Sequence, residues 1–280
     1  MIDIIIPVYN TPLDDLNRCF TSIINQSYCD YKIIIIDDGS NDTVRLYLDD
    51  FVRNHDKFNV IHIKNSGVSN ARNIGIEKSD SKYITFVDSD DTLEKDFLKE
   101  SFEIIENNNL DIIIGGYNEI KKNQRIRTRI CQPGLHIYDE KNVDNFMEKL
   151  LSSKTNENNK EIADCPTGRI YNRLFKRSSI GDLRFDTNIH MSEDTLFMID
   201  YVKKAKRIGI VDKIWYNYYI NDYSISNATN KKEMINSIKG FIKQIEIRRN
   251  MELKENLRKA YQDRIDKSNK HISRIMQKKL

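Results

Sequence analysis

Continuous runs of β-branched residues alternate with amphipathic segments over the first 118 residues of the chain. The runs that predict strands are 2–6, 31–37, 59–63, 82–88 and 110–120. Apolar residues at helical spacing predict helices over 13–26, 43–54 and 94–108, and a loop that runs into a helix over 65–78. Strands buried on both faces need such uninterrupted apolar runs. Because strands alternate with helices, the expected fold class is α/β with a mostly parallel sheet.

The pattern becomes less regular after residue 118, which divides the chain into three expected parts: 1–118, 119–230 and 231–280. The middle part predicts an extended or hairpin excursion over 121–138, a helix over 140–151, a mobile polar loop over 152–161 and a helix over 193–206. The last part keeps a helical period and predicts one long helix or a helix pair.

The charge of the chain is uneven. Residues 231–280 hold 15 Lys or Arg and 6 Asp or Glu, a net +9, so the remainder carries −6 within a total of +3. This basic tail has three interpretations: packing on the rest of the protein, self-association, or contact with the anionic inner leaflet of a membrane. The last two are favoured here. Nucleic-acid binding is not expected, because no recognition motif accompanies the charge.

The apolar runs are short, and the longest reach only about a third of the roughly 20 residues that span a bilayer. The start, "MIDIIIPVYN", lacks the basic region and cleavage site of a signal peptide. The four cysteines have neither disulfide-scaffold nor zinc spacing, which is typical of a reducing compartment. The expected location is therefore cytoplasmic, with a possible peripheral contact on the inner face of the plasma membrane.

Polar clusters follow the predicted strands at 7–10, 37–42, 65–75 and 88–91. In open parallel sheets, ligands bind outside the carboxyl ends of the strands. The glycine-rich motifs that wrap phosphates in backbone amides are absent. The carboxylates of these clusters instead predict a divalent cation, Mn²⁺ or Mg²⁺, that would in turn bind phosphate. An alternative for Asp91 is that it caps the helix that follows.

The segments "IIIPVYN", "IIIIDDGSND", "NSGVSNARNIGI" and "YITFVDSDD" occur in order at the expected intervals. Together they resemble the family 2 inverting glycosyltransferases, whose A-type fold has a Rossmann-like sheet. The resemblance is close over 2–118 and looser through "IYNRLFKRSSI" and "SEDTLF". It is strongest to bacterial enzymes that build surface glycans. It implies a nucleotide-sugar donor, expected to be a UDP-sugar, and a divalent metal.

The resemblance implies a nucleotide site in 1–118, formed by Pro7, Val8, Tyr9, Asn10, Asp38, Gly39, Arg72, Asp88 and Ser89. Within it, Asp38 would accept a hydrogen bond from the pyrimidine ring, and Gly39 would allow close approach. Arg72 would reach the nucleotide or its phosphates through its planar guanidinium. Asp88 would contact the ribose.

The same resemblance implies the metal ligands and the catalytic residues. Asp90 would be the principal metal ligand, with Asp88 beside it. Asp194 of "SEDTLF" would be the base that deprotonates the acceptor hydroxyl, and Glu193 would orient the acceptor. A structural interpretation remains open for this segment, because Ser192 and the two acids also fit a helix N-terminus.

The middle part, 119–230, would supply the acceptor site and the base. Trp215, Tyr216 and Tyr218 are expected to offer aromatic surfaces to an acceptor, although alternation along a strand would place one set in the core. The expected acceptor is a glycan or a lipid-linked saccharide. The Q-x-x-R-W motif of processive relatives is missing, so one sugar should be added per encounter.

Two alternative functions stay open on the sequence. A sugar-1-phosphate nucleotidylyltransferase would want a glycine-rich loop after the first strand, where "PVYNTP" stands. A catalytically degenerate binding module would be expected to lack one of the motif acids. All four acids, Asp38, Asp88, Asp90 and Asp194, are present.

Overall fold

A computed structural model of the chain describes residues 1–131, 133–152, 168–221 and 231–277. Its strands are β1 (Ile2–Val8), β2 (Tyr31–Asp37), β3 (Phe58–His62), β4 (Tyr83–Phe86), β5 (Thr92–Leu93), β6 (Ile112–Lys121), β7 (Gln124–Arg129), β8 (Leu135–Tyr138), β9 (Arg173–Lys176) and β10 (Ile208–Tyr219). Its helices are α1 (Leu13–Ile24), α2 (Asp42–Arg53), α3 (Val68–Lys78), α4 (Phe97–Asn107), α5 (Val143–Ser152), α6 (Arg177–Ile180), α7 (Glu193–Lys204), α9 (Lys231–Met251) and α10 (Glu255–Gln277).

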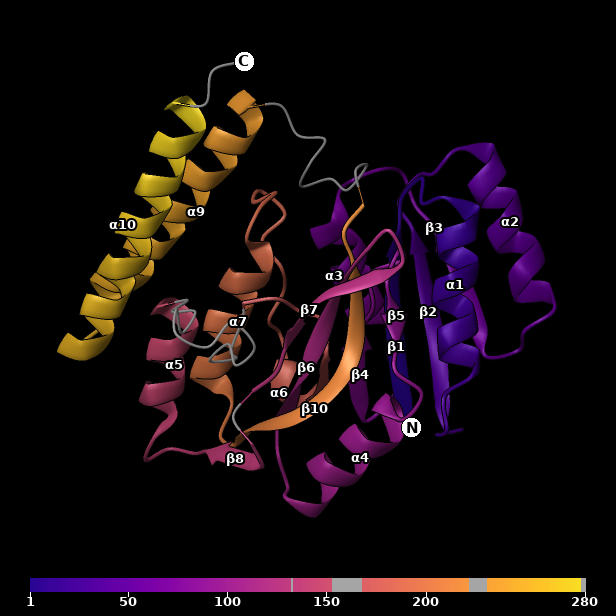
Figure 1. Cartoon of the computed structure of the whole chain (residues 1–280), viewed down its shortest axis with the longest axis horizontal. Helices are drawn as coiled ribbons and strands as arrows, with labels where there is room; N and C mark the ends of the chain where they lie inside the picture. Colours follow the sequence, from indigo (N-terminus) through magenta and orange to yellow (C-terminus); the bar gives the residue numbers. More distant parts are fainter. Residues whose placement is uncertain (132, 153–167, 222–230, 278–280) are drawn as a thin grey trace.

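The described strands form one 10-stranded sheet in the order β3-β2-β1-β4-β9-β6-β10-β5, with β7 on β6 and β8 on β10 (Figure 1). The strands β3, β2, β1 and β4 are parallel to one another, as the alternating pattern predicts. Beyond β4 the sheet is mixed, because β9 runs antiparallel to both of its neighbours. The α/β class is confirmed, and the parallel expectation holds fully only for the amino-terminal half.

The less regular middle part also follows the expectation in outline. The excursion over 121–138 is a hairpin between β6 and β7, followed by β8 on the edge of β10. Apart from Ser152, the loop predicted over 152–161 lies outside the described residues. The helix predicted from 94 begins at Phe97 instead, because Thr92 and Leu93 pair with β10 as a short strand.

Register and close packing bring the functional segments to one edge of the sheet. Val8 at the end of β1 lies opposite Asp37 at the end of β2, so the loops that follow start side by side. Helix α3 packs directly on β1 through Gly75, where a Cβ atom would approach Ile5 Cγ2 to 2.3 Å. This close approach positions Arg72, which lies about one turn earlier on α3.

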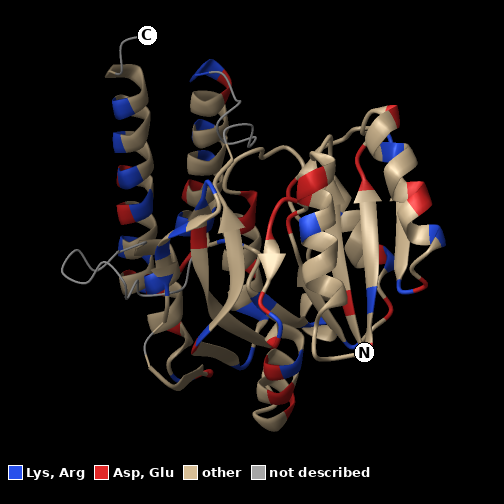
Figure 2. Cartoon of the chain, turned by 45° about the vertical axis from the view of Figure 1, so that its right-hand side comes forward, with Lys and Arg blue, Asp and Glu red and all other residues tan. Residues whose placement is uncertain are grey.

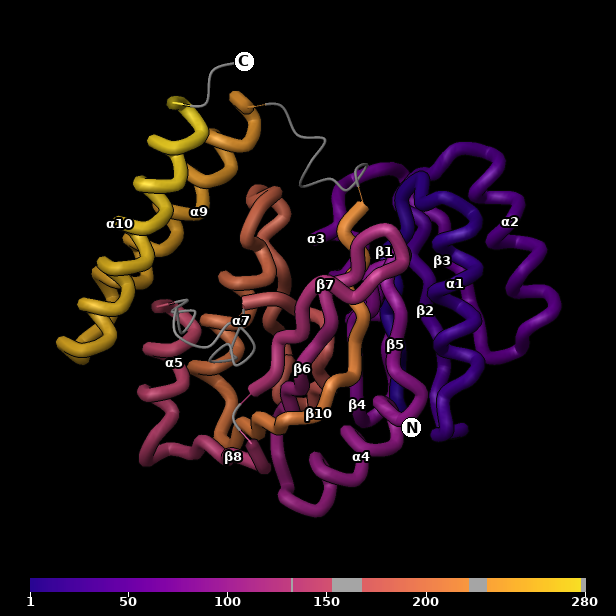
Figure 3. The backbone as a smooth tube through the Cα atoms, in the orientation of Figure 1, coloured from indigo at the N-terminus to yellow at the C-terminus, as the bar shows by residue number. Residues whose placement is uncertain are grey.

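The basic tail forms an antiparallel pair, α9 and α10, at the end of the molecule away from α1 and α2 (Figures 1 and 3). The pair packs on α5 and α7. The buried side chains that make this contact continuous with the core include Ile238, Phe241, Ile242, Ile245, Leu257, Tyr261 and Ile265. The first interpretation of the tail is therefore observed: its apolar face packs on the protein itself.

Lys and Arg residues are spread along both helices of this pair (Figure 2), and most of them are exposed. Some of them tie the pair to the body of the protein. Lys254 pairs with Asp144 at 2.7 Å, and Arg248 pairs with Asp200 on α7. Among the residues that the structure describes, no helix combines the length and the apolar character needed to cross a bilayer.

The helix pair should contribute to the stability of the whole fold. Phe241 is 2% exposed, so Phe241→Ala should lower the free energy of unfolding by about 3–5 kcal/mol through lost burial and a cavity. Leu253 is 87% exposed on the turn of the same pair, so Leu253→Ala should change it by about 0.5 kcal/mol or less. Urea unfolding measures both. Equal stability of the two variants would show that the pair is not part of the cooperative core.

Candidate active site

The loop after β1 is held against the loop after β2. The Asn10 side-chain oxygen accepts hydrogen bonds from Asn41 N at 2.8 Å and Asn41 Nδ2 at 2.9 Å, and Asn10 N donates to Ser40 Oγ at 2.9 Å. Tyr9 is 48% exposed at the same edge. Pro7 and Val8 lie in β1 and are buried. Of these four predicted nucleotide residues, Tyr9 and Asn10 present their side chains, whereas Val8 belongs to the core.

Asp38 supports the loop that precedes α3. Its Oδ1 accepts from Ser66 N at 2.7 Å and Ser66 Oγ at 3.2 Å, and its Oδ2 accepts from Gly67 N at 2.8 Å. A carboxylate offers about four acceptor positions, so Asp38 can bind one further donor. Gly39 has φ of 75°, and a Cβ there would meet Asn65 N at 2.7 Å. Both residues therefore fix the shape of the loop before α3, beside the predicted base site.

The side chains of the segment 88–91 have different surroundings. The Ser89 hydroxyl shares a 2.7 Å hydrogen bond with Thr11 Oγ1 behind the loop. Asp91 is fully buried, where its Oδ2 accepts from the Tyr216 hydroxyl and its Oδ1 from Tyr219 N, both at 2.7 Å. The suggested helix-capping role of Asp91 is wrong, because this carboxylate joins the loop to β10.

Arg72 lies at the centre of a group of acidic side chains at this edge of the sheet. It is 4% exposed, and its Nη2 donates to Asp88 Oδ1 at 3.0 Å. Its Nη1 donates to Asp194 Oδ1 at 2.7 Å and to Glu193 Oε1 at 3.1 Å. One guanidinium thus gathers acids from two segments more than 100 residues apart. The structure brings together the predicted nucleotide residues Arg72 and Asp88 and the predicted base.

Helix α7 presents Glu193 and Asp194 in its first turn. Ser192 stands at the N-cap position of α7, as expected, but it has a left-handed φ of 66° and its side chain makes no capping hydrogen bond. Burial raises the pKa of Asp194 to about 8, while the Arg72 charge opposes the shift and the charges of Glu193 and Asp88 add to it. A carboxyl with a raised pKa is suited to accept a proton from a hydroxyl.

Asp88 and Asp90 are the carboxylates predicted to hold a divalent cation. Asp90 Oδ2 accepts from Asn221 Nδ2 at 3.0 Å, and no ion pair with Asp90 occurs among the described residues. Burial, followed by the Asp88 charge, raises the pKa of Asp90 to about 6, which a nearby cation would offset. In the described part of the chain, no three His, Cys, Asp or Glu side chains form a group that could hold a metal. Two carboxylates suffice for Mg²⁺ when phosphates and water complete its coordination.

The three predicted acceptor aromatics have different surroundings. Trp215 is 1% exposed, packs on Phe97 and donates from Nε1 to Glu100 Oε2 at 2.8 Å, so it offers no surface to an acceptor. Tyr216 is fully buried. Tyr218 is half-buried at the edge of the site. Both faces of β10 are covered at this point, which alternation along a strand could not reveal. Of the three residues, only Tyr218 is exposed enough to remain a candidate for acceptor contact.

Two supporting residues were not predicted. Arg18 Nη2 donates to the Asp90 carbonyl oxygen at 2.7 Å, and its guanidinium carbon lies 3.8 Å from the centre of the Tyr219 ring. Asn221 holds the Asp90 side chain through its amide nitrogen. Neither residue lies in a motif with recognisable spacing. Both residues contact Asp90 in the loop 88–91, called here the acidic loop. They lie 72 and 131 residues from Asp90 in the sequence, so local patterns carry no signal for these contacts.

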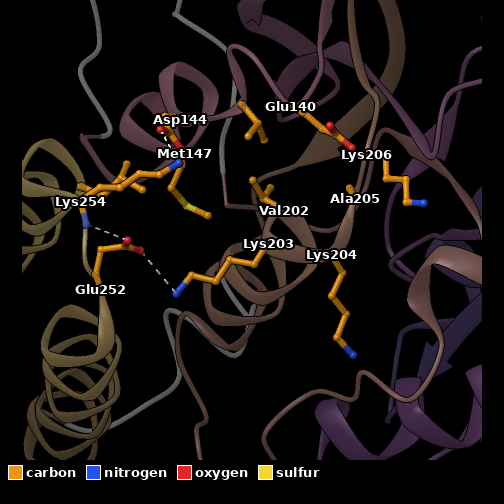
Figure 4. Close-up of a pocket in the computed structure, with 12 residues that line it drawn as sticks. Glu140, Asp144, Met147, Val202, Lys203, Lys204, Ala205, Lys206, Glu252 and Lys254 are labelled. Atoms are coloured by element: carbon orange, nitrogen blue, oxygen red, sulfur yellow. Dashed lines mark hydrogen bonds and ion pairs between the residues drawn. The ribbon is translucent and has the colours of Figure 1, made fainter.

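A cavity of about 420 Å³ lies away from this edge, at the other end of α7 (Figure 4). Its lining includes Lys203, Lys204 and Lys206 at the end of α7, together with Met147 of α5. It is therefore separate from the acids at the start of α7.

Residues 3–184, more than half of the chain, match the model of the family described as glycosyl transferase family 2. The chain belongs to glycosyl transferase family 2. Among the relatives of this family 2 glycosyltransferase is the poly(ribitol-phosphate) beta-N-acetylglucosaminyltransferase TarP of Staphylococcus aureus. The two are 30% identical over 290 residues, covering 94% of this chain and 79% of TarP.

Two further relatives are longer than the present chain. The glycosyltransferase GlyA of Streptococcus pneumoniae is 28% identical over 83% of this chain, which spans only 32% of GlyA. The uncharacterized glycosyltransferase EpsJ of Bacillus subtilis is 29% identical over 84% of this chain, which spans 65% of EpsJ. This family 2 glycosyltransferase thus corresponds to a part of each of these two proteins.

Solved structures share the fold of this family 2 glycosyltransferase. S. aureus TarS 1–349 in complex with UDP-GlcNAc superposes with a TM-score of 0.72 at 18% identity, covering 97% of this chain and 72% of that chain. The mannosyltransferase PcManGT from Pyrobaculum calidifontis, in complex with GDP-Man and Mn²⁺, gives 0.63 at 12% identity, covering 98% and 72%. These likenesses confirm the A-type fold.

The raised pKa of Asp194 makes the stability of this glycosyltransferase depend on pH. Its pKa is higher in the folded than in the unfolded state, so its contribution is greatest at low pH and is lost between about pH 4 and about pH 8. Without metal or nucleotide, the free energy of unfolding should therefore fall from pH 5 to pH 8, and Asp194→Asn should reduce this fall. Urea unfolding at both pH values measures it.

The control for this measurement is Asp182→Asn. Asp182 is an exposed carboxylate that pairs with Lys204, so its replacement should leave the fall between pH 5 and pH 8 close to that of the wild type. An Asp194→Asn variant with the full wild-type fall would contradict the assignment of this titration to Asp194.

Proposed function

We propose that this enzyme transfers one sugar from a nucleoside diphosphate sugar to an acceptor hydroxyl, with inversion at the anomeric carbon and with a divalent metal. The expected donor is a UDP-sugar, and the product would belong to a bacterial surface polysaccharide. The observation that carries the proposal is that Arg72 forms ion pairs with both Asp194, the candidate base, and Asp88 of the loop 88–91. The two carboxylates therefore lie on the same guanidinium. A base and a donor site must be adjacent for direct displacement.

The donor would lie along the edge formed by the loops after β1, β2 and β4. Asn10 and Asp38 would hold the base, and Asp88 the ribose. Asp88 and Asp90 would hold Mn²⁺ or Mg²⁺, which supplies charge neutralisation to the departing diphosphate. The TarS structure is a complex with UDP-GlcNAc, and the PcManGT structure is a complex with GDP-Man and Mn²⁺. These two complexes support a nucleotide-sugar donor and a divalent metal.

The acceptor hydroxyl would be deprotonated by Asp194. Its carboxylate lies 2.7 Å from the Arg72 guanidinium, which keeps it oriented, while Glu193 on the same guanidinium would hold the acceptor. A single base opposite the leaving group is what inversion requires. Tyr218 at the edge of β10 would contact the acceptor. The family match gives no support to the alternative of a nucleotidylyltransferase. The alternative of a binding module without catalysis is distinguished from an enzyme by a transfer assay.

The acceptor class is suggested by the relatives. TarP is named as a poly(ribitol-phosphate) beta-N-acetylglucosaminyltransferase. A bacterial surface glycan or a lipid-linked saccharide is therefore the proposed acceptor. The outer basic face of α9 and α10 would contact either the anionic inner membrane surface or a second copy of the chain. Sedimentation with anionic vesicles at low and high salt, together with the solution mass, distinguishes these contacts.

The metal assignment is tested on Asp90. Asp90→Asn should weaken the Mn²⁺-dependent part of UDP binding by about a hundredfold, because it removes one of two anionic ligands. Calorimetric titration with UDP, with and without Mn²⁺, measures this part. Asp186→Asn, in an exposed turn, is the control and should bind as the wild type does. Unchanged Mn²⁺-dependent affinity in the Asp90 variant would refute the ligand assignment.

The base assignment is tested on Asp194. Asp194→Asn should keep UDP affinity within about threefold but lower transfer by about 10²–10⁴-fold, because the acceptor proton loses its base. The assay uses the nucleotide sugar that raises Tm most in the presence of Mn²⁺, with poly(ribitol phosphate) as the acceptor probe. Near wild-type turnover would exclude Asp194 as the base. Donor binding by a wild-type protein that shows no transfer would favour the binding module.

A further inference from the structure

Arg169 lies just before β9 and is surrounded by tyrosine rings. Its guanidinium carbon is 4.9 Å from the ring centre of Tyr218, 5.4 Å from that of Tyr117 and 5.5 Å from that of Tyr171. Its Nη1 also donates to the Tyr171 hydroxyl. The rings come from β6, β10 and the segment before β9. Each can stabilise a cation over its face.

Among the residues that the structure describes, no carboxylate offsets the charge of Arg169. In the part of the chain that the structure describes, no Asp or Glu oxygen lies within 4.0 Å of its guanidinium nitrogens. Burial raises the pKa of both Tyr171 and Tyr218, so these phenols stay neutral. Arginine remains protonated in proteins. Within the described part of the chain, Arg169 is therefore a half-buried permanent cation without a paired carboxylate, which is costly unless a ligand supplies an anion.

The backbone beside Arg169 packs on the helix that carries the candidate base. A Cβ on Gly168 would lie 2.1 Å from Thr195 Oγ1, so the backbone immediately before Arg169 packs against the residue that follows Asp194. On its other side, Tyr171 stacks on Tyr216 with ring centres 4.4 Å apart. Tyr216 in turn donates to Asp91 of the acidic loop. The tyrosine rings around Arg169 thus connect the start of α7, which carries the candidate base, with the acidic loop 88–91.

The strands that hold the Arg169 side chain differ from those that lead into the proposed donor site. The proposed nucleotide edge is formed by the loops after β1, β2 and β4, whereas Arg169 is held by side chains on or beside β6, β9 and β10. These strands form the half of the sheet that carries Tyr218, the proposed acceptor contact. An anion bound at Arg169 would therefore belong to the acceptor and not to the nucleotide.

We propose that Arg169 and Tyr218 form an anion subsite that binds a phosphate or carboxylate of the acceptor next to the hydroxyl that attacks. A planar guanidinium binds either oxyanion through two parallel hydrogen bonds. The half-buried Tyr218 ring would pack on the sugar or polyol that carries the charge. This subsite rests on the proposed function, and it makes acceptor charge a determinant of specificity.

The test is a binding experiment on the full chain saturated with UDP and Mn²⁺. Calorimetry compares ribitol 5-phosphate with ribitol, and glucuronic acid with glucose, so the two pairs distinguish phosphate from carboxylate. Wild type should bind one charged member at least about tenfold more tightly than its neutral partner. Arg169→Gln should abolish this preference, and Arg169→Lys should retain part of it because it keeps the charge without the planar fork.

Two controls separate the subsite from other effects. Arg207→Gln removes another half-buried arginine, at the opposite end of β10 from Tyr218, and should keep the preference. UDP affinity should be unchanged in Arg169→Gln, which also shows that the variant folds. A tenfold loss of UDP affinity would make Arg169 a donor ligand and overturn the proposal.

The subsite and the proposed function fail in different ways. Equal binding of charged and neutral probes by wild type, or a preserved preference in Arg169→Gln, overturns the subsite while leaving UDP binding intact. The same titrations without UDP detect the subsite independently of the donor. Failure of wild type to bind any nucleotide would instead contradict the proposed function.

Discussion

The arrangement of the candidate site depends on one buried guanidinium. Arg72 joins Asp88, which follows a strand of the amino-terminal half, to Glu193 and Asp194 at the start of α7. Without this charge, three carboxylates would repel one another in a partly buried space. The guanidinium is placed by α3, whose close contact with β1 is possible because residue 75 is glycine. Backbone packing in the core thereby sets the distance between two chemical functions.

Sharing one cation also couples these functions electrostatically. Asp88 and Asp194 both bind Arg72, and the Asp88 charge contributes to the raised pKa of Asp194. A change of charge on the Asp88 side, such as arrival of a nucleotide with its metal, alters the field at Asp194. The proton affinity of the proposed base thus depends on whether the donor site is filled.

Much of the fold follows from local sequence, whereas the site depends on contacts that local sequence does not encode. Strands such as 31–37 are predictable because continuous apolar runs are needed for burial on both faces. The burial of Trp215 depends on α4 covering β10, and the burial of Asp91 depends on a tyrosine 125 residues away. Arg72 lies within a recognisable motif, but nothing in that motif identifies its partners at 193 and 194.

Trp215, the single tryptophan of the chain, has a consequence for observing the enzyme. Its indole is enclosed by Phe97 and hydrogen-bonded to Glu100, and the next residue, Tyr216, contacts the acidic loop through Asp91 and the backbone amide of Asp88. The indole therefore lies one residue along the chain from a side chain that contacts this loop. The protein carries its own fluorophore next to the segment expected to respond first to a ligand, and no external label is needed to follow it.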